Sequence, residues 1–156
     1  MSSNRKDIIT GFIIIVLIIA GVYLFKYLKK EKTIQVTPSP ASYEFKKDFS
    51  DSFKINIPDN VNAIELNDIS GGDTRGIATE NEVLVDANDP ENSYFYEAWL
   101  EKDGKQVSLG KLQMAKGGWL LSYDKSKYVG YKKIIISLEK TNDNKIEKRI
   151  LEGSFN

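Results

Sequence analysis

Few residues of this sequence have types and spacings that would support catalysis, and the sequence contains neither cysteine nor histidine. The lack of cysteine excludes disulfides, thiolate metal sites and thiol nucleophiles, and the lack of histidine removes the commonest general base. Ser122 and Lys125 match the S-x-x-K spacing of penicillin-interacting serine enzymes, whose serine begins a helix and whose S-D-N and K-T-G partner motifs are absent here. We therefore interpret the match as chance and predict a protein that is not an enzyme.

Oxygen-bearing side chains gather in two predicted loops: Asp68 with Asp73 around Gly71-Gly72, and Asp86 with Asn88, Asp89 and Glu91. Such oxygens can bind calcium, but the glycine and terminal glutamate of an EF-hand loop are missing. Solvated turns with aspartate caps are the favoured interpretation, so we expect no metal and no cofactor. Glu97 and Glu101 share one face of a predicted strand and lie too far apart to share a proton.

Aromatic residues are frequent in the predicted strands, and three of them define a candidate binding surface: Phe95, Trp99 and Trp119. Exposed rings of this kind serve sugar- and peptide-binding modules, whereas buried rings fill β-sheet cores. Trp99 falls on the strand face opposite Tyr96 and Leu100, so one of these two sets must point away from the main core. Packing within the sheet is the favoured alternative.

The elements that would position these side chains begin with an apolar run, residues 8–28, which has no charge from Ile8 to Phe25 and is long enough to cross the hydrocarbon core of a bilayer as a helix. We predict a single transmembrane helix here, and the residues taken to contact lipid are Ile8, Phe12, Ile15, Leu17, Tyr23 and Phe25. Residues 1–7 form a short cytoplasmic tail, and residues 29–42 form a basic flank and a linker that contains Pro38 and Pro40. Residues 43–156 form the remaining domain.

Charge is divided unevenly along the chain, although the total is zero. Residues 1–41 contain six Lys/Arg and two Asp/Glu, and residues 42–156 contain sixteen Lys/Arg and twenty Asp/Glu. The basic flank suits anionic lipid headgroups, and the mildly acidic domain is a poor candidate for binding nucleic acid. We expect the lipid bilayer and an envelope or membrane protein as partners, and no nucleic acid.

Short strand patterns recur after residue 50, with turns every eight to twelve residues. They begin at Phe53, Ile55 and Ile57, and the clearest runs from Tyr94 to Lys102 into an Asp103-Gly104 hairpin turn. Ser108–Gly110 is expected to form a bulge in the returning strand. Residues 43–51 predict only a short helix or edge segment. The pattern indicates an all-β domain, an antiparallel β-sandwich-like fold tethered to the transmembrane helix.

Four short motifs follow one another in the domain: Tyr96-Glu97-Ala98-Trp99-Leu100, Val107-Ser108-Leu109-Gly110-Lys111-Leu112, Ile136-Ser137-Leu138-Glu139-Lys140 and Leu151-Glu152-Gly153. In order and spacing this series resembles the extracytoplasmic C-terminal domain of the anti-sigma-K factor family (regulator of sigma K). The resemblance implies a sandwich-like domain outside the cytoplasmic membrane on a single-span anchor. Family members bind a sigma factor through a helical domain before the span. Seven residues precede Ile8 here, so we expect no direct sigma-factor binding.

The resemblance and the anchor together predict a cytoplasmic membrane protein with its N-terminus inside and its domain outside. The four lysines that follow the span favour the opposite orientation, but whole domains translocate largely regardless of charge. We expect an envelope sensing or protein-interaction module. The alternatives are a carbohydrate- or peptide-binding module of the envelope, and a pilin-like or pseudopilin subunit. Gly11-Phe12 before an apolar run is typical of a prepilin cleavage site, although Val16 stands where the pilin glutamate is expected.

Overall fold

The computed structural model describes residues 40–156. The predicted transmembrane helix, and with it the lipid-facing residues Ile8, Phe12, Ile15, Leu17, Tyr23 and Phe25, lies outside the described residues. From residue 40 onward, no helix has the length and apolar character that crossing a bilayer requires.

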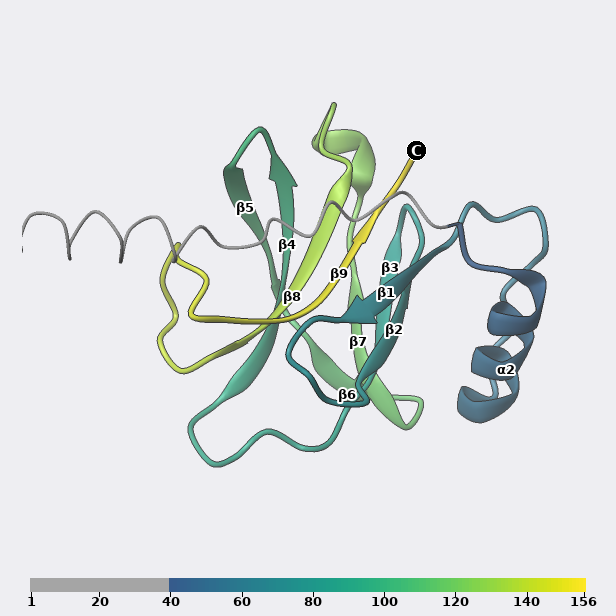
Figure 1. Cartoon of the computed structure of the whole chain (residues 1–156), viewed down its shortest axis with the longest axis horizontal. Coiled ribbons are helices and arrows are strands. Elements are labelled where there is room, and N and C mark those ends of the chain that lie inside the picture. Colours follow the sequence, from purple (N-terminus) through teal and green to yellow (C-terminus); the bar gives the residue numbers. More distant parts are fainter. Residues whose placement is uncertain (1–39) are drawn as a thin grey trace, which may run out of the picture. The chain divides into compact units, whose positions relative to one another are not determined.

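Nine strands form the domain, and every pairing between neighbours is antiparallel. The strands are β1 (Ile64–Asp68), β2 (Arg75–Ala78), β3 (Glu82–Asp86), β4 (Phe95–Lys102), β5 (Lys105–Lys111), β6 (Gln113–Ala115), β7 (Gly118–Ser122), β8 (Lys133–Glu139) and β9 (Lys148–Ser154). Their order in the sheet is β5-β4-β8-β9-β1-β2-β3-β7-β6 (Figure 1). The all-β, antiparallel expectation is therefore confirmed.

The sheet curls until it is nearly a barrel, because its two end strands, β5 and β6, are consecutive in the chain. Leu112 joins them and donates its backbone N–H to Tyr96 O at 2.9 Å. Strand β1 forms the opposite corner, since Ile64 to Leu66 pair with β2 and Asn67 and Asp68 pair with β9. One half of the sheet is thus β1-β2-β3-β7-β6, and the other is β5-β4-β8-β9-β1.

The main core lies between these two halves and is filled from both. Val83 and Val85 of β3 face alternate residues of β4 and β8, among them Ala98, Ile134 and Ile136, all inaccessible to solvent. Burying such side chains supplies about 25 cal/mol for each Å² of apolar surface removed from water. The period-two alternation that predicted the strands is the same alternation that separates core residues from outward ones.

The hairpin turn and the bulge lie where the sequence predicts them. Asp103 and Gly104 both adopt positive φ, 50° and 75°, as a two-residue type I′ hairpin between β4 and β5 requires. The bulge expected at Ser108–Gly110 is present, because the β4–β5 register shifts between Ala98 and Trp99 and Gly110 has φ 119°. This bulge bends the strand that continues into β6.

A helix, α2 (Tyr43–Phe53), forms over residues 43–51, where the sequence allowed a short helix or an edge segment, and it runs on to Phe53. Ile55 and Ile57 follow it outside any strand, so the strand predicted at Phe53, Ile55 and Ile57 was wrong. The Ser42 side chain caps the helix by accepting the Phe45 N–H at 3.1 Å. Phe45, Phe49 and Phe53 are spaced by four residues and stack at 5.5 and 4.8 Å between ring centroids. Lys54 ends the helix in the left-handed conformation, with φ 50°.

One end of the near-barrel collects several connections that matter below. Strand register places there the start of β1, the β2–β3 and β4–β5 turns, the loop of residues 123–132 and the C-terminus. Pro40, where the described chain begins, also lies at this end, because it forms a β-bridge with Ile64. We call it the entry end. The β6–β7 turn lies at the opposite end.

Candidate functional site

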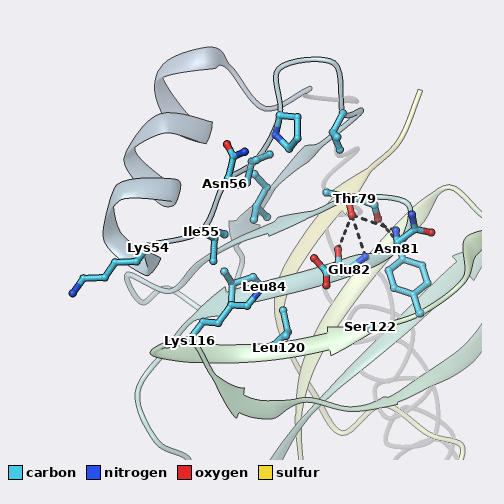
Figure 2. Close-up of a pocket in the computed structure, with 15 residues that line it drawn as sticks. Lys54, Ile55, Asn56, Thr79, Asn81, Glu82, Leu84, Lys116, Leu120 and Ser122 are labelled. Carbon is cyan, nitrogen blue, oxygen red and sulfur yellow. Dashed lines mark hydrogen bonds between the residues drawn. The ribbon is translucent and has the colours of Figure 1, made fainter.

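A groove of ≈ 770 Å³ lies between residues 54–61 and the outer face of β2, β3 and β7 (Figure 2). Its floor is the sheet, and its wall is the segment that leads from α2 toward β1. The lining residues are Lys54, Ile55, Asn56, Ile57, Pro58, Val61, Ile77, Thr79, Asn81, Glu82, Leu84, Lys116, Leu120, Ser122 and Tyr123. The volume lies within the range that ligand sites in proteins occupy.

The floor of the groove changes from apolar to polar along the strands. Ile77, Leu84 and Leu120 are directly paired across β2, β3 and β7 and form one apolar row. Two residues along each strand toward the entry end, Thr79, Glu82 and Ser122 form a polar row. Because directly opposed side chains stand about 5 Å apart, each row is a continuous strip.

Helix α2 covers the part of the same face that lies on the other side of the apolar row. Phe49 and Phe53 form a small core with Ala63, Ile77 and Leu84. Arg75 holds the helix from the sheet side, because its guanidinium pairs with Asp48 and with Asp86 and lies 5.5 Å from the centre of the Phe49 ring. The groove is therefore the part of the face that the helix leaves uncovered.

The wall of the groove presents backbone as well as side chains. Ile55 and Ile57 are half-buried and Asn56 between them is exposed, which is the alternation of an extended chain. Ile55 donates its N–H to Ser50 O, but within residues 40–156 neither the N–H nor the C=O of Asn56 or Ile57 has a backbone partner. An extended segment lying in the groove could pair with these groups.

The polar end of the groove is held rigid by local hydrogen bonds. Thr79 Oγ1 accepts the backbone N–H groups of Asn81 and Glu82, as the dashed lines of Figure 2 show. The Tyr123 hydroxyl donates to Thr79 O at 2.6 Å. Burial, and then the charge of Glu80, raise the pKa of Tyr123 far above its usual range, so Tyr123 stays a neutral donor.

The two ends of the groove carry opposite charge. Lys54 and Lys116 line the end near the β6–β7 turn, and Glu82 lines the end near the β2–β3 turn. All three side chains are exposed. A bound segment would therefore meet cations at one end, an apolar strip in the middle and a carboxylate at the other end.

The three candidate aromatic residues do not form one exposed surface. Trp99 is on the outer face of β4 but only 1% exposed, and its Nε1 donates to Ser137 Oγ at 2.8 Å. Trp119 is half-buried against the main core and meets the Tyr96 ring edge-on at 5.5 Å. Phe95 is half-buried, with Lys111 Nζ 3.7 Å from its ring centre. Packing accounts for these rings, and the candidate aromatic platform is not assembled.

The other sequence candidates lie in structural roles. Ser122 ends β7, whereas the Lys125 ammonium lies 3.6 Å from the centre of the Phe155 ring and 3.3 Å from Glu80 Oε1, so no hydrogen bond joins the S-x-x-K pair among the described residues. Asp86 pairs with Arg75. Within residues 40–156 no group of three acidic side chains has the geometry to hold a metal ion.

Asp68 caps the loop that follows β1. Its carboxylate accepts the backbone N–H groups of Ser70, Gly71, Gly72 and Thr74 at 2.7 to 3.2 Å. Burial pushes the pKa of Asp68 upward, but the hydrogen bonds from Gly72, Ser70 and Gly71 outweigh it and leave the pKa below its ordinary value. Asp68 thus caps the turn, as the sequence predicts.

The groove itself was missed in the sequence, because residues 53–57 were interpreted as a strand. A signal was present: Ser42 as an N-cap, followed by phenylalanines at 45, 49 and 53, is a helix pattern. The groove follows from that helix, since it separates residues 54–61 from the sheet. Compared with known proteins, the chain matches no family model, no curated protein and no solved structure.

Proposed function

We propose that this protein is a membrane-anchored, non-catalytic module of the cell envelope that binds an extended segment of a partner protein in the groove beside α2. The anchor is the apolar run of residues 8–28, and the resemblance to the extracytoplasmic domain of anti-sigma-K factors is the ground for placing the sandwich-like domain outside the membrane. Direct sigma-factor binding is not part of the proposal.

The observation that carries the proposal is the graded floor of the groove. The apolar row of Ile77, Leu84 and Leu120 offers a place for one or two apolar side chains of the partner. The backbone of Asn56 and Ile57 offers main-chain pairing beside that row. Main-chain pairing supplies affinity and side-chain pockets supply specificity when an extended peptide binds beside a sheet.

Charge gives the bound segment a direction. An acidic residue of the partner would meet Lys54 and Lys116, and a basic residue would meet Glu82. Exposed ion pairs contribute little affinity, about 0–1 kcal/mol each, but they favour one orientation over the reverse.

The test is binding of fluorescent peptides to the full chain in nanodiscs, measured by anisotropy. The probe is a peptide with glutamate at one end, two leucines in the middle and lysine at the other end; the control peptide has serines in place of the leucines. We expect the leucine peptide alone to bind, and Leu120→Ser to weaken it by about tenfold, the effect of losing most of one buried aliphatic contact.

The matched control variant is Met114→Ser, an exposed position on β6 that does not line the groove. It should leave peptide affinity unchanged. Equal binding of the two peptides, or equal affinity of the Leu120→Ser and unaltered chains with unchanged thermal unfolding, would refute the proposal. Lys116→Glu should weaken the same peptide and strengthen one with the charges exchanged.

A further inference from the structure

The loop of residues 123–132 presents an apolar tip to solvent. Val129 is 84% exposed, more than any other large hydrophobic side chain of the described residues. It is held there by a tight turn, because Tyr131 donates its N–H to Tyr128 O at 3.1 Å and Gly130 has φ 82°. Its neighbours in the turn, Tyr128 and Tyr131, are half-buried against the main core, and their rings pack edge-on against each other at 6.4 Å. The exposure is therefore built into the turn.

Lysines are frequent in this loop, and one from a neighbouring strand reaches it. Lys125, Lys127 and Lys132 belong to the same loop. A fourth, Lys102 at the end of β4, reaches across from the neighbouring hairpin, where its Cδ and Cε lie 3.5 and 3.2 Å from the position of a Cβ built on Gly130. Both the hairpin and the loop stand at the top of Figure 1.

Two acidic side chains near the loop, Asp124 and Glu80, are already partnered, whereas Asp103 is exposed in the β4–β5 turn beside Lys102. Asp124 accepts the Ser126 N–H at 3.0 Å and lies 3.8 Å from Lys127 Nζ, and Glu80 pairs with Lys125. Apolar and tyrosine side chains with lysines nearby are a composition typical of protein segments at a bilayer interface. The rings suit the headgroup region, and lysine stems extend toward phosphates.

The loop lies at the end of the domain to which the chain leads from the proposed anchor. It lies at the entry end, where Pro40 pairs with Ile64 and Ala41 donates to Ala63 O at 2.9 Å. The chain between the apolar run and this point, residues 29–39, can span on the order of 35 Å at most. The end of the domain that carries Val129 is thus the end tethered to the predicted anchor.

We propose that the loop of residues 123–132 docks on the bilayer that holds the chain's own anchor, with Val129 and the two tyrosines at the interface and Lys102, Lys127 and Lys132 on anionic phosphate headgroups. This rests on the anchor of the proposed function. Docking sets the direction of the groove: its Glu82 end, also at the entry end, faces the membrane, and its Lys116 end faces away.

The chain lacks cysteine, so single cysteines report position cleanly. We would place nitroxides at Val129→Cys, Met114→Cys and Ile15→Cys in the full chain, in nanodiscs of phosphatidylcholine with and without phosphatidylglycerol. The measurement is the ratio of collision rates with oxygen, which enters lipid, and with a water-soluble nickel complex. Met114 is the matched control because it is 52% exposed and lies near the β6–β7 turn.

We expect the ratio at residue 129 to be severalfold higher than at residue 114, and to rise further with phosphatidylglycerol. Adding Lys127→Glu and Lys132→Glu should return it toward the value at residue 114. If residue 15 reports lipid while residue 129 matches residue 114, docking is refuted and the anchor stands. If residue 15 reports water, the anchor and the docking proposal fall together.

Discussion

Phe53, the last residue of α2, lies so close to Gly118 of β7 that a Cβ built on Gly118 would stand 2.7 Å from Phe53 Cε1. The backbone oxygen of Val85 would be 2.8 Å away from the same position. The end of α2 therefore packs on β7 at Gly118, which has no side chain, and the groove begins beyond this contact. This contact fixes the distance between α2 and the floor.

We predict that Gly118→Ala destabilises the domain by about 1–3 kcal/mol, the usual cost of forcing an extra methyl group into packed surroundings. The measurement is urea unfolding followed by circular dichroism. In a Phe53→Leu background, which vacates the Cε1 position, the loss should be smaller. Equal losses in both backgrounds would mean that Phe53 is not what the methyl group meets.

A ring of four ion pairs on the outer face of β4, β8 and β9 gives a second prediction. Arg149 bonds Glu101 at 2.8 Å and Glu152 at 2.6 Å, and Lys133 lies between the same two carboxylates. Burial pushes the pKa of Glu101 upward, but hydrogen bonds from Gln106 and Arg149 and the charge of Lys133 outweigh it and lower the pKa.

Arg149→Met should cost about 2 kcal/mol, between the values for exposed and buried pairs, because the Glu152 side chain is only 6% exposed. The free energy of unfolding in urea measures this. Lys127→Met is the matched control, since its pair with Asp124 is 3.8 Å long and exposed, and it should cost less than about 0.5 kcal/mol. Equal costs would show that burial does not strengthen the ring.

The turn capped by Asp68 gives a third prediction, a loss of stability that depends on pH. Asp68→Ala removes the acceptor of four backbone N–H groups and should cost about 1–3 kcal/mol at neutral pH. Because the folded pKa of Asp68 is lowered, its contribution is present above the unfolded value of 3.8 and is lost as pH falls through the folded pKa. The unfolding free energies of the two proteins, measured from neutral to acidic pH, should converge at the acidic end.

The strands and their turns were predictable because their signals are local. The Asp103-Gly104 turn, the bulge at Gly110 and the alternation in β4 each follow from a few neighbouring residues. The closure of the sheet was not predictable, since it depends on β5 and β6 being two parts of one bent strand. The packing of α2 against Gly118 was not predictable either, because in the sequence Gly118 is only the second glycine of a turn.

The buried carboxylates were missed for the same reason. Glu97 was interpreted as lying on a solvated strand face with Glu101, and Glu139 was not singled out, yet both are almost inaccessible. The Ser108 hydroxyl donates to Glu97 Oε1, whereas Glu97 Oε2 has no partner among the described residues. The 140–147 loop contributes to this burial, because Glu147 donates its N–H to both oxygens of Glu139 at 3.2 and 3.1 Å. A contact between a loop and the end of the strand before it leaves no periodic signal.

Glu139 gives the last prediction, because its charge is unfavourable in the fold. Burial raises its pKa, and the charges of Glu147 and Glu97 raise it further, although hydrogen bonds from Ser137 and from the Glu147 N–H act in the opposite direction. When the folded pKa of a carboxyl lies above the unfolded value of 4.5, the domain becomes less stable as pH rises through that interval.

Glu139→Gln keeps an oxygen acceptor for the Glu147 N–H and removes the charge. It should therefore stabilise the domain at pH 7, and the gain should vanish below the unfolded pKa. Thermal unfolding across this range measures it, with Glu147→Gln as control: the pKa of exposed Glu147 is lowered by hydrogen bonds from Lys140 and Thr141, so this variant should destabilise at pH 7. A Glu139→Gln protein with no gain at neutral pH would show that the two N–H contacts already offset the buried charge.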